Sequence, residues 1–122
     1  MASFISVVDD DESVRESIVG LMRSVGFAVQ GFASAKEFLN SDHLNDTECL
    51  ILDVRMPGMD GIELHRHLLA IHRQIPVIFM TAHGSDEEMR SRALATGAVD
   101  YLIKPLSEDE LLNAVHGVLS SK

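Results

Sequence analysis

Short apolar runs alternate with amphipathic segments along the whole chain, and no other feature of the sequence constrains the fold as strongly. Apolar runs typical of β-strands lie at residues 4–8, 27–31, 49–52, 77–81 and 99–103. Segments with apolar residues at helical spacing follow them at 11–25, 34–39, 61–71, 86–96 and 108–120. Strict alternation of strands and helices is typical of a parallel sheet with helices on both faces. The sequence therefore predicts an α/β fold.

The size and composition of the chain suit one domain with one core, since 46% of its 122 residues are hydrophobic. No internal repeat, linker or low-complexity stretch divides the sequence. We therefore expect a single domain over residues 1–122.

The net charge of −9 argues against nucleic-acid binding by this domain, because neutralising phosphates needs a Lys/Arg patch that the sequence lacks. The chain contains one cysteine, Cys49, so no disulfide can form within it, which favours a reducing compartment. The N-terminal residues do not resemble a signal peptide, and no apolar run reaches membrane-spanning length. We expect the protein to be cytoplasmic.

Polar side chains stand at the ends of four of the expected strands. Asp9 and Asp10 follow the first strand, Asp53 follows the third, Thr81 ends the fourth and Lys104 follows the fifth. In open parallel sheets, ligands bind beyond the carboxyl ends of the strands, where the strand order reverses. We therefore expect these side chains to meet at one edge of the sheet.

The chemistry of this group suits phosphoryl transfer. Carboxylates held close together repel one another and have raised pKa values unless a cation lies between them, and oxygen ligands suit Mg²⁺. A carboxylate such as that of Asp53 can attack a phosphoryl group and form an acyl phosphate. Lys104 and the hydroxyl of Thr81 would then stabilise the phosphoryl oxygens.

Four segments of the sequence resemble one known family. They are VVDDDESVR at 7–15, LILDVRMPGMDGIEL at 50–64, PVIFMTAHG at 76–84 and GAVDYLIKPL at 97–106. In this order and at these separations they resemble the CheY-like receiver domain of bacterial two-component response regulators, and their wording is closest to regulators of the FixJ type. The resemblance covers essentially the whole chain.

The resemblance implies a flavodoxin-like fold of five βα units, a three-layer sandwich with a parallel sheet of strand order 2-1-3-4-5. It also implies that Asp53 is the phosphoacceptor and that the cofactor is Mg²⁺ or Mn²⁺. By this resemblance Asp10 and Asp53 would bind the metal directly. Arg55 would contribute its backbone carbonyl, and Asp9 would act through a water molecule.

By the same resemblance, Thr81 and Lys104 would contact the phosphoryl group. Thr81 and Tyr101 would form a switch pair, in which the aromatic ring turns inward when the threonine hydroxyl is drawn to the phosphate. The family also leads us to expect a cis peptide bond between Lys104 and Pro105.

Two further residues, Arg55 and His83, each lie two positions after a site residue. In receiver domains these positions flank the phosphoryl group. We expect Arg55 and His83 to tune how fast water hydrolyses the acyl phosphate.

The function implied is a signalling switch that catalyses only its own phosphorylation and dephosphorylation. The phosphoryl donor would be a histidine kinase, a phosphotransfer protein or a small phosphodonor. Phosphorylation would change the surface formed by residues 86–96, 99–103 and 108–120, which an output domain or partner reads. Receivers of the FixJ type usually precede a DNA-binding domain. A homodimer through 86–96 and 99–103 is a further hypothesis.

Two other classes of protein use similar sites. An aspartyl-nucleophile phosphatase usually carries a second acid two residues after the nucleophile, where this chain has Arg55. A nucleotide- or flavin-binding module needs a phosphate loop rich in glycine, serine or threonine after the first strand, where this chain has acids. Both classes are therefore disfavoured.

Several polar residues have structural explanations. Asp11 suits the start of a helix, where the dipole favours an acid, and Asp60 suits a turn. His65, His67 and His72 lie on one expected helix, but no pair is three or four residues apart, so they do not form a metal site. We expect all three histidines to lie on the surface.

Overall fold

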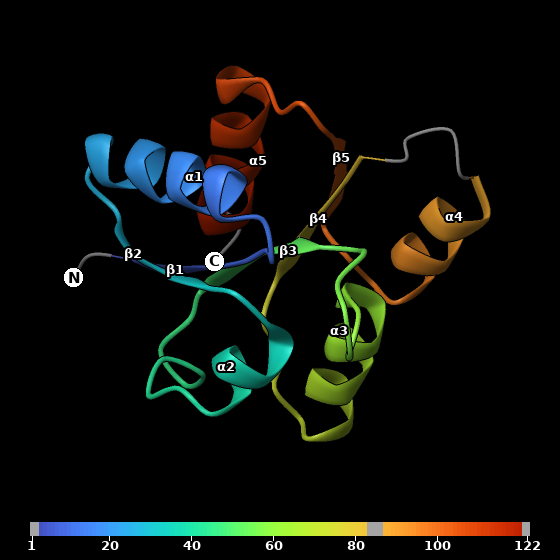
Figure 1. The fold of residues 1–122 in the computed structure, drawn as a ribbon. Helices are drawn as coiled ribbons and strands as arrows, with labels where there is room; N and C mark the ends of the chain where they lie inside the picture. The colour runs from blue at the N-terminus through green and yellow to red at the C-terminus, as the bar shows by residue number, and fades with distance from the viewer. Residues whose placement is uncertain (1–2, 83–86, 121–122) are drawn as a thin grey trace.

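The computed structural model describes residues 3–82 and 87–120, and within these ranges strands alternate with helices from end to end (Figure 1). The strands are β1 (Phe4–Val8), β2 (Ala28–Phe32), β3 (Cys49–Asp53), β4 (Val77–Thr81) and β5 (Asp100–Ile103). The helices are α1 (Glu12–Ser24), α2 (Ala35–Leu39), α3 (Gly61–Ala70), α4 (Glu87–Ala95) and α5 (Glu108–Ser120). In this part of the chain, no helix combines the length and apolar character needed to cross a bilayer.

All neighbouring strands pair in parallel, in the order β2-β1-β3-β4-β5. This confirms the predicted fold and strand order. The chain moves from β1 outward to β2 and then returns to the other side of β1 with β3. The order therefore reverses between β1 and β3, which is where parallel α/β sheets place their ligands.

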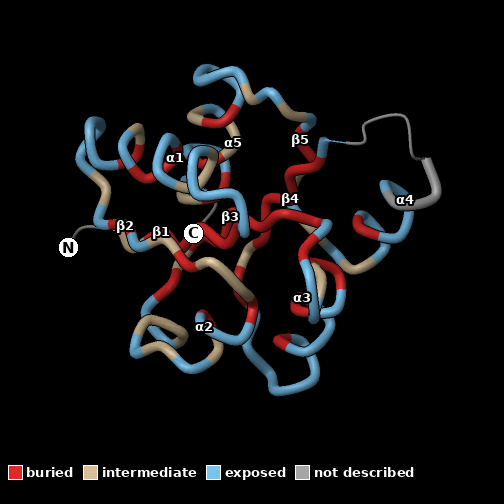
Figure 2. Tube along the Cα trace, in the orientation of Figure 1, coloured by how far each residue is buried: buried red, intermediate tan, exposed pale blue. Residues whose placement is uncertain are grey.

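The sheet is the middle of three layers. Helices α1 and α5 cover one face and α2, α3 and α4 the other (Figure 1). Each face has its own cluster of buried apolar side chains. Every residue of β3 and β4 is buried, because these central strands have helices on both faces (Figure 2). The short apolar runs of the sequence are thus explained by burial on both sides.

Serine side chains cap the starts of two helices. Ser34 accepts a hydrogen bond from the Glu37 amide at the start of α2. The Glu37 carboxylate does not reach back to Ser34 but accepts from the Ala33 amide, one residue earlier. Ser107 accepts from the Glu110 amide before α5. Each serine thus satisfies an amide group that has no partner within its helix.

The prediction that His65 lies on the surface is wrong. His65 is only 4% exposed, and its Nδ1 atom lies 2.7 Å from Oγ1 of Thr96, which follows α4. It lies in the buried stripe of α3, three residues after Ile62 and three before Leu68. Leu69, by contrast, faces outward. Burial lowers the pKa of His65.

Candidate functional site

The carboxyl ends of the strands bring together the polar residues that the sequence predicts at this edge. Asp9 follows β1, Asp53 ends β3 and Thr81 ends β4. The strands are in register there, since Val8 pairs with Leu52. Residues more than forty positions apart in sequence therefore meet because parallel strands end at the same edge of the sheet.

Asp53 is held at the junction between β3 and α3. Its side chain is almost fully buried, with 5% of the residue exposed. Gly61, the first residue of α3, packs directly on the Asp53 backbone, where a Cβ atom would collide with the Asp53 carbonyl oxygen. Asp60 caps α3 in a reciprocal capping box with Glu63, so it is a helix cap rather than only a turn residue. The start of α3 thus holds Asp53 in place.

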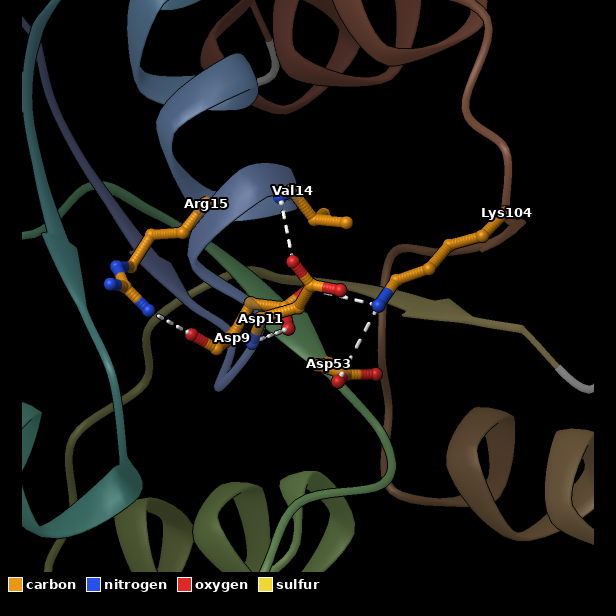
Figure 3. A network of polar contacts seen from close by, with 6 residues as sticks. All are labelled: Asp9, Asp11, Val14, Arg15, Asp53 and Lys104. Carbon is orange, nitrogen blue, oxygen red and sulfur yellow. Dashed lines mark hydrogen bonds and ion pairs between the residues drawn. The ribbon is translucent and has the colours of Figure 1, made fainter.

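Lys104 connects two of the carboxylates. Its Nζ atom donates a hydrogen bond to Oδ2 of Asp9 at 2.9 Å and lies 3.5 Å from Oδ2 of Asp53 (Figure 3). The peptide bond between Lys104 and Pro105 is cis, as expected. The ammonium group therefore reaches the acids of β1 and β3 from the end of β5.

The charges in this site shift the pKa values of two groups. Burial, reinforced by the negative charge of Asp9, raises the pKa of Asp53 to about 7, although Lys104 and a hydrogen bond from the Arg55 backbone oppose the rise. Burial works to lower the pKa of Lys104, but its hydrogen bond to Asp9 and the charges of Asp53 and Asp9 outweigh it and raise the pKa. The single positive charge of Lys104 therefore does not fully neutralise the carboxylates around it.

Asp9, Asp10 and Asp53 each bring a carboxylate oxygen to one place, and these oxygens all lie within 4.8 Å of one another. Asp10 is exposed to solvent, whereas Asp9 has no exposed surface. An oxygen-only set with excess negative charge is the chemistry that Mg²⁺ and Mn²⁺ prefer. The residues present therefore fit a hard divalent cation.

The Asp9 carboxylate is held by hydrogen bonds from the protein itself. Its Oδ1 atom accepts a hydrogen bond from the Asp11 amide at 2.9 Å, and its Oδ2 atom accepts from Lys104 at the same distance. Both of its carboxylate oxygens are thus engaged by the protein. Asp10 and Asp53 are the better placed of the three to bind a cation directly.

Thr81 and Tyr101, the expected switch pair, lie on adjacent strands. Thr81 pairs with Ile103 and Phe79 pairs with Tyr101, so both side chains are on the same face of the sheet. Thr81 is buried, and the Tyr101 ring is also buried, in the cluster that contains Phe79. In this structure the ring already occupies an inward position.

The two residues expected to tune hydrolysis differ in what the structure provides. Arg55 is exposed beside the site, and its backbone is hydrogen-bonded to the Asp53 side chain. His83 lies outside the described residues.

Sequence reasoning missed two residues that support the site, Arg15 and Gly61. Arg15, on α1, donates a hydrogen bond to the backbone carbonyl of Asp9 at 2.8 Å (Figure 3). The helical pattern marks Arg15 only as a polar position. Gly61 directly after a helix-capping acid was the available signal, because glycine at a helix start permits close backbone approach.

Comparisons with known proteins agree with this geometry. A family model described as the response regulator receiver domain matches residues 5–116. Response regulator protein TodT of Pseudomonas putida is 46% identical over 118 residues, 97% of this chain and 52% of TodT. Transcriptional regulatory protein FixJ of Azorhizobium caulinodans is 41% identical over 115 residues, 94% of this chain and 54% of FixJ. The chain spans about half the length of these curated relatives.

Solved structures show the same likeness in three dimensions. The response regulator StyR superposes with a TM-score of 0.89 at 47% identity, covering 98% of this chain and 60% of that chain. The structure named FixJ-N superposes with a TM-score of 0.87 at 35% identity, covering 98% of this chain and 95% of that one. Sequence, fold and the arrangement of acids at the sheet edge lead to one conclusion: this chain belongs to the family of receiver domains of two-component response regulators.

Proposed function

We propose that Asp53 is the phosphoacceptor of this receiver domain. The observation that carries the proposal is the position of its carboxylate, buried at the end of β3 and 3.5 Å from the Lys104 ammonium within a cluster of acids. A rigidly held carboxylate beside a fixed cation suits attack on a phosphoryl group. Asp53 is therefore the nucleophile of a switch that modifies itself.

In the reaction, an Oδ atom of Asp53 attacks phosphorus and forms a P–O bond as the P–N bond of a phosphohistidine breaks. The electron pair of that bond stays on the imidazole nitrogen, which takes up a proton. Lys104 and the Thr81 hydroxyl balance the charge of the phosphoryl oxygens. Hydrolysis of the acyl phosphate by water later restores the carboxylate. The domain thus catalyses its own modification and does not turn over a separate substrate.

A divalent cation, Mg²⁺ or Mn²⁺, would be held by Asp10, Asp53 and the backbone carbonyl of Arg55, with Asp9 acting through a water molecule. When bound, it would neutralise negative charge on the transferred group. The support for this proposal is the oxygen-only cluster and the raised pKa of Asp53, which both reflect excess negative charge.

Phosphorylation replaces one negative charge at the sheet edge with roughly two. We propose that Thr81 responds to this charge and that Tyr101 transmits the response to the surface formed by α4, β5 and α5. The phosphoryl donor would be a histidine kinase or a phosphotransfer protein, and an output domain would read the surface. We further propose that this exchange occurs in the cytoplasm, which family membership supports.

The direct test is incubation with acetyl phosphate and Mg²⁺, followed by intact mass measurement. We expect one phosphoryl adduct on the wild-type chain and none on Asp53→Asn or in EDTA. Asp42→Asn, which changes an exposed acid away from the site, is the matched control and should be modified like the wild type. An adduct that persists in Asp53→Asn would refute the assignment.

Arg55 and His83 are proposed to set the lifetime of the phosphorylated state. Arg55 lies exposed beside the acids, as a residue controlling water access would. Changing both residues and finding the wild-type dephosphorylation rate would contradict this role.

A homodimer through α4 and β5 is proposed for the phosphorylated state. Leu94 on α4 is 41% exposed and Ile103 on β5 is 52% exposed, and Val99, directly before β5, is 52% exposed. We expect beryllofluoride, a phosphoryl mimic, to increase the apparent mass in size-exclusion chromatography. A monomer that stays unchanged, with beryllofluoride shown to be bound, would count against the dimer.

A further inference from the structure

The side chain of Arg15 reaches from the first turns of α1 to the loop that carries the acids. Its Nη1 atom donates to the backbone carbonyl of Asp9 at 2.8 Å, and the side chain is half-buried (Figure 3). This carbonyl belongs to the planar peptide group that joins Asp9 to Asp10. The guanidinium therefore fixes the orientation of the peptide from which the Asp10 side chain departs.

Asp9 is held at each of its other polar groups as well. Its amide donates to the Phe32 carbonyl at 3.1 Å, and its carboxylate accepts from the Asp11 amide and from Lys104. Asp10 differs, since across residues 3–82 and 87–120 no hydrogen bond or ion pair holds its carboxylate. The direction of the exposed Asp10 side chain therefore depends on its backbone.

Gly31, in β2, leaves the space through which Arg15 passes. A Cβ atom at Gly31 would lie 2.9 Å from Cγ and 3.1 Å from Cδ of Arg15, and 3.2 Å from Cγ2 of Val19. Real Cβ atoms essentially never come closer than 3.0 Å to another heavy atom, so a larger residue at this position would displace the Arg15 stem. The space left by Gly31, a notch in β2, therefore lets the Arg15 side chain reach the Asp9 carbonyl.

We propose that Arg15 is a positioning residue for the acidic cluster, holding the peptide between Asp9 and Asp10 so that Asp10 faces Asp53, with Gly31 as the notch that admits its side chain. The proposal rests on the proposed function in one respect, that this cluster binds a divalent cation. If Arg15 acted only through its positive charge, its removal would have the opposite effect. Loss of a positive charge near the cluster would tighten cation binding.

The test uses the full chain with Arg15→Met, which keeps the stem and removes the donor, and Arg15→Lys, which restores a donor and the charge. Arg23→Met, on an exposed position of the same helix, is the control for charge. Mg²⁺ affinity is measured by calorimetry. We expect Arg15→Met to weaken binding roughly threefold to tenfold, from the loss of one hydrogen bond, and Arg15→Lys to recover part of it. Arg23→Met should match the wild type.

A second measurement does not depend on the metal. The exchange rate of the Asp11 amide, which donates to Asp9, is followed by NMR in EDTA. We expect exchange to be several times faster in Arg15→Met and closer to the wild type in Arg15→Lys. Gly31→Ala should act in the same direction in both measurements, with Gly20→Ala, which has open space around it, as its control.

Wild-type or tighter Mg²⁺ binding by Arg15→Met, or unchanged exchange of the Asp11 amide, would overturn the positioning role. If Arg15→Met does not fold, Gly31→Ala decides by the same two readouts. Failure of the wild type to bind Mg²⁺ would refute the proposed cation site. In that case the exchange rates still decide whether Arg15 holds the acidic loop.

Discussion

Asp53 combines burial with ionisation, and these two properties oppose each other. Burial raises its pKa to about 7, from an ordinary value of 3.8, while Lys104 limits the rise. The same position that makes the carboxylate rigid also makes its charged form costly in free energy. A nucleophile at this position is destabilised until a cation balances it.

This conflict predicts a pH dependence for the metal-free protein. The pKa of Asp53 is higher in the folded chain than in the unfolded chain. Between about pH 4 and pH 7, the folded chain therefore keeps a proton on Asp53 that the unfolded chain has released. The free energy of unfolding should therefore fall as pH rises through this window. Asp53→Asn should remove that fall and be more stable above pH 7 by up to about 4 kcal/mol.

The measurement is urea unfolding in EDTA at several pH values, with Asp42→Asn as the exposed control. Parallel pH profiles for the wild type and Asp53→Asn would show that Asp53 titrates normally.

At the scale of elements, α4 buries few of the side chains that the structure describes for it. Of its described side chains, residues 90–95, only Ala93 is buried. Thr96 adds a polar connection, because its hydroxyl donates to the Ala93 carbonyl at 2.6 Å and its oxygen lies 2.7 Å from Nδ1 of His65 on α3. Since that hydroxyl has only one proton, His65 is the donor of the second bond.

We predict that Thr96→Val, which keeps the shape and removes the hydroxyl, loosens α4. Loss of both bonds should speed hydrogen exchange of the α4 amides severalfold while leaving the amides of α5 unchanged. His65→Gln should produce a smaller effect, and His67→Gln, on the exposed face of α3, none. Equal exchange in Thr96→Val and the wild type would show that packing alone holds α4.

At the scale of the whole molecule, the acidic cluster exists only in the folded state. Its members come from the ends of β1 and β3, and Lys104 comes from the end of β5. Regions distant in sequence must fold together before their oxygens lie near one another. A ligand of this cluster therefore binds the folded chain and not the unfolded one.

Mg²⁺ should consequently stabilise the entire fold. At a free concentration one hundred times its Kd, the free energy of unfolding should rise by about 2.7 kcal/mol. Asp10→Asn should reduce this gain, since it removes the exposed acid without disturbing a buried contact. Urea unfolding midpoints with MgCl₂, compared with NaCl at the same ionic strength, measure the effect. A midpoint that ignores Mg²⁺ would argue against the cation site.

Much of this organisation was predictable, because short apolar runs and helical periodicity encode local structure directly. The polar residues at the strand ends then identified the site edge, since parallel strands terminate together. His65 shows where this reasoning fails. Its polarity favoured the surface, but its spacing from Ile62 and Leu68 places it in the buried stripe of α3. The partner that makes its burial acceptable, Thr96, is distant in sequence.

The sequence by itself determined the α/β alternation, the strand order through its family resemblance, and which kinds of group gather at the sheet edge. Only the tertiary structure decided how those groups divide their tasks. In the folded chain Asp9 is buried and accepts a hydrogen bond from Lys104, whereas Asp10 is exposed. The Arg15 side chain passes Gly31 and donates to the backbone carbonyl of Asp9. The physical reason is that periodicity reflects burial along one segment, whereas hydrogen bonds between segments depend on how the segments pack.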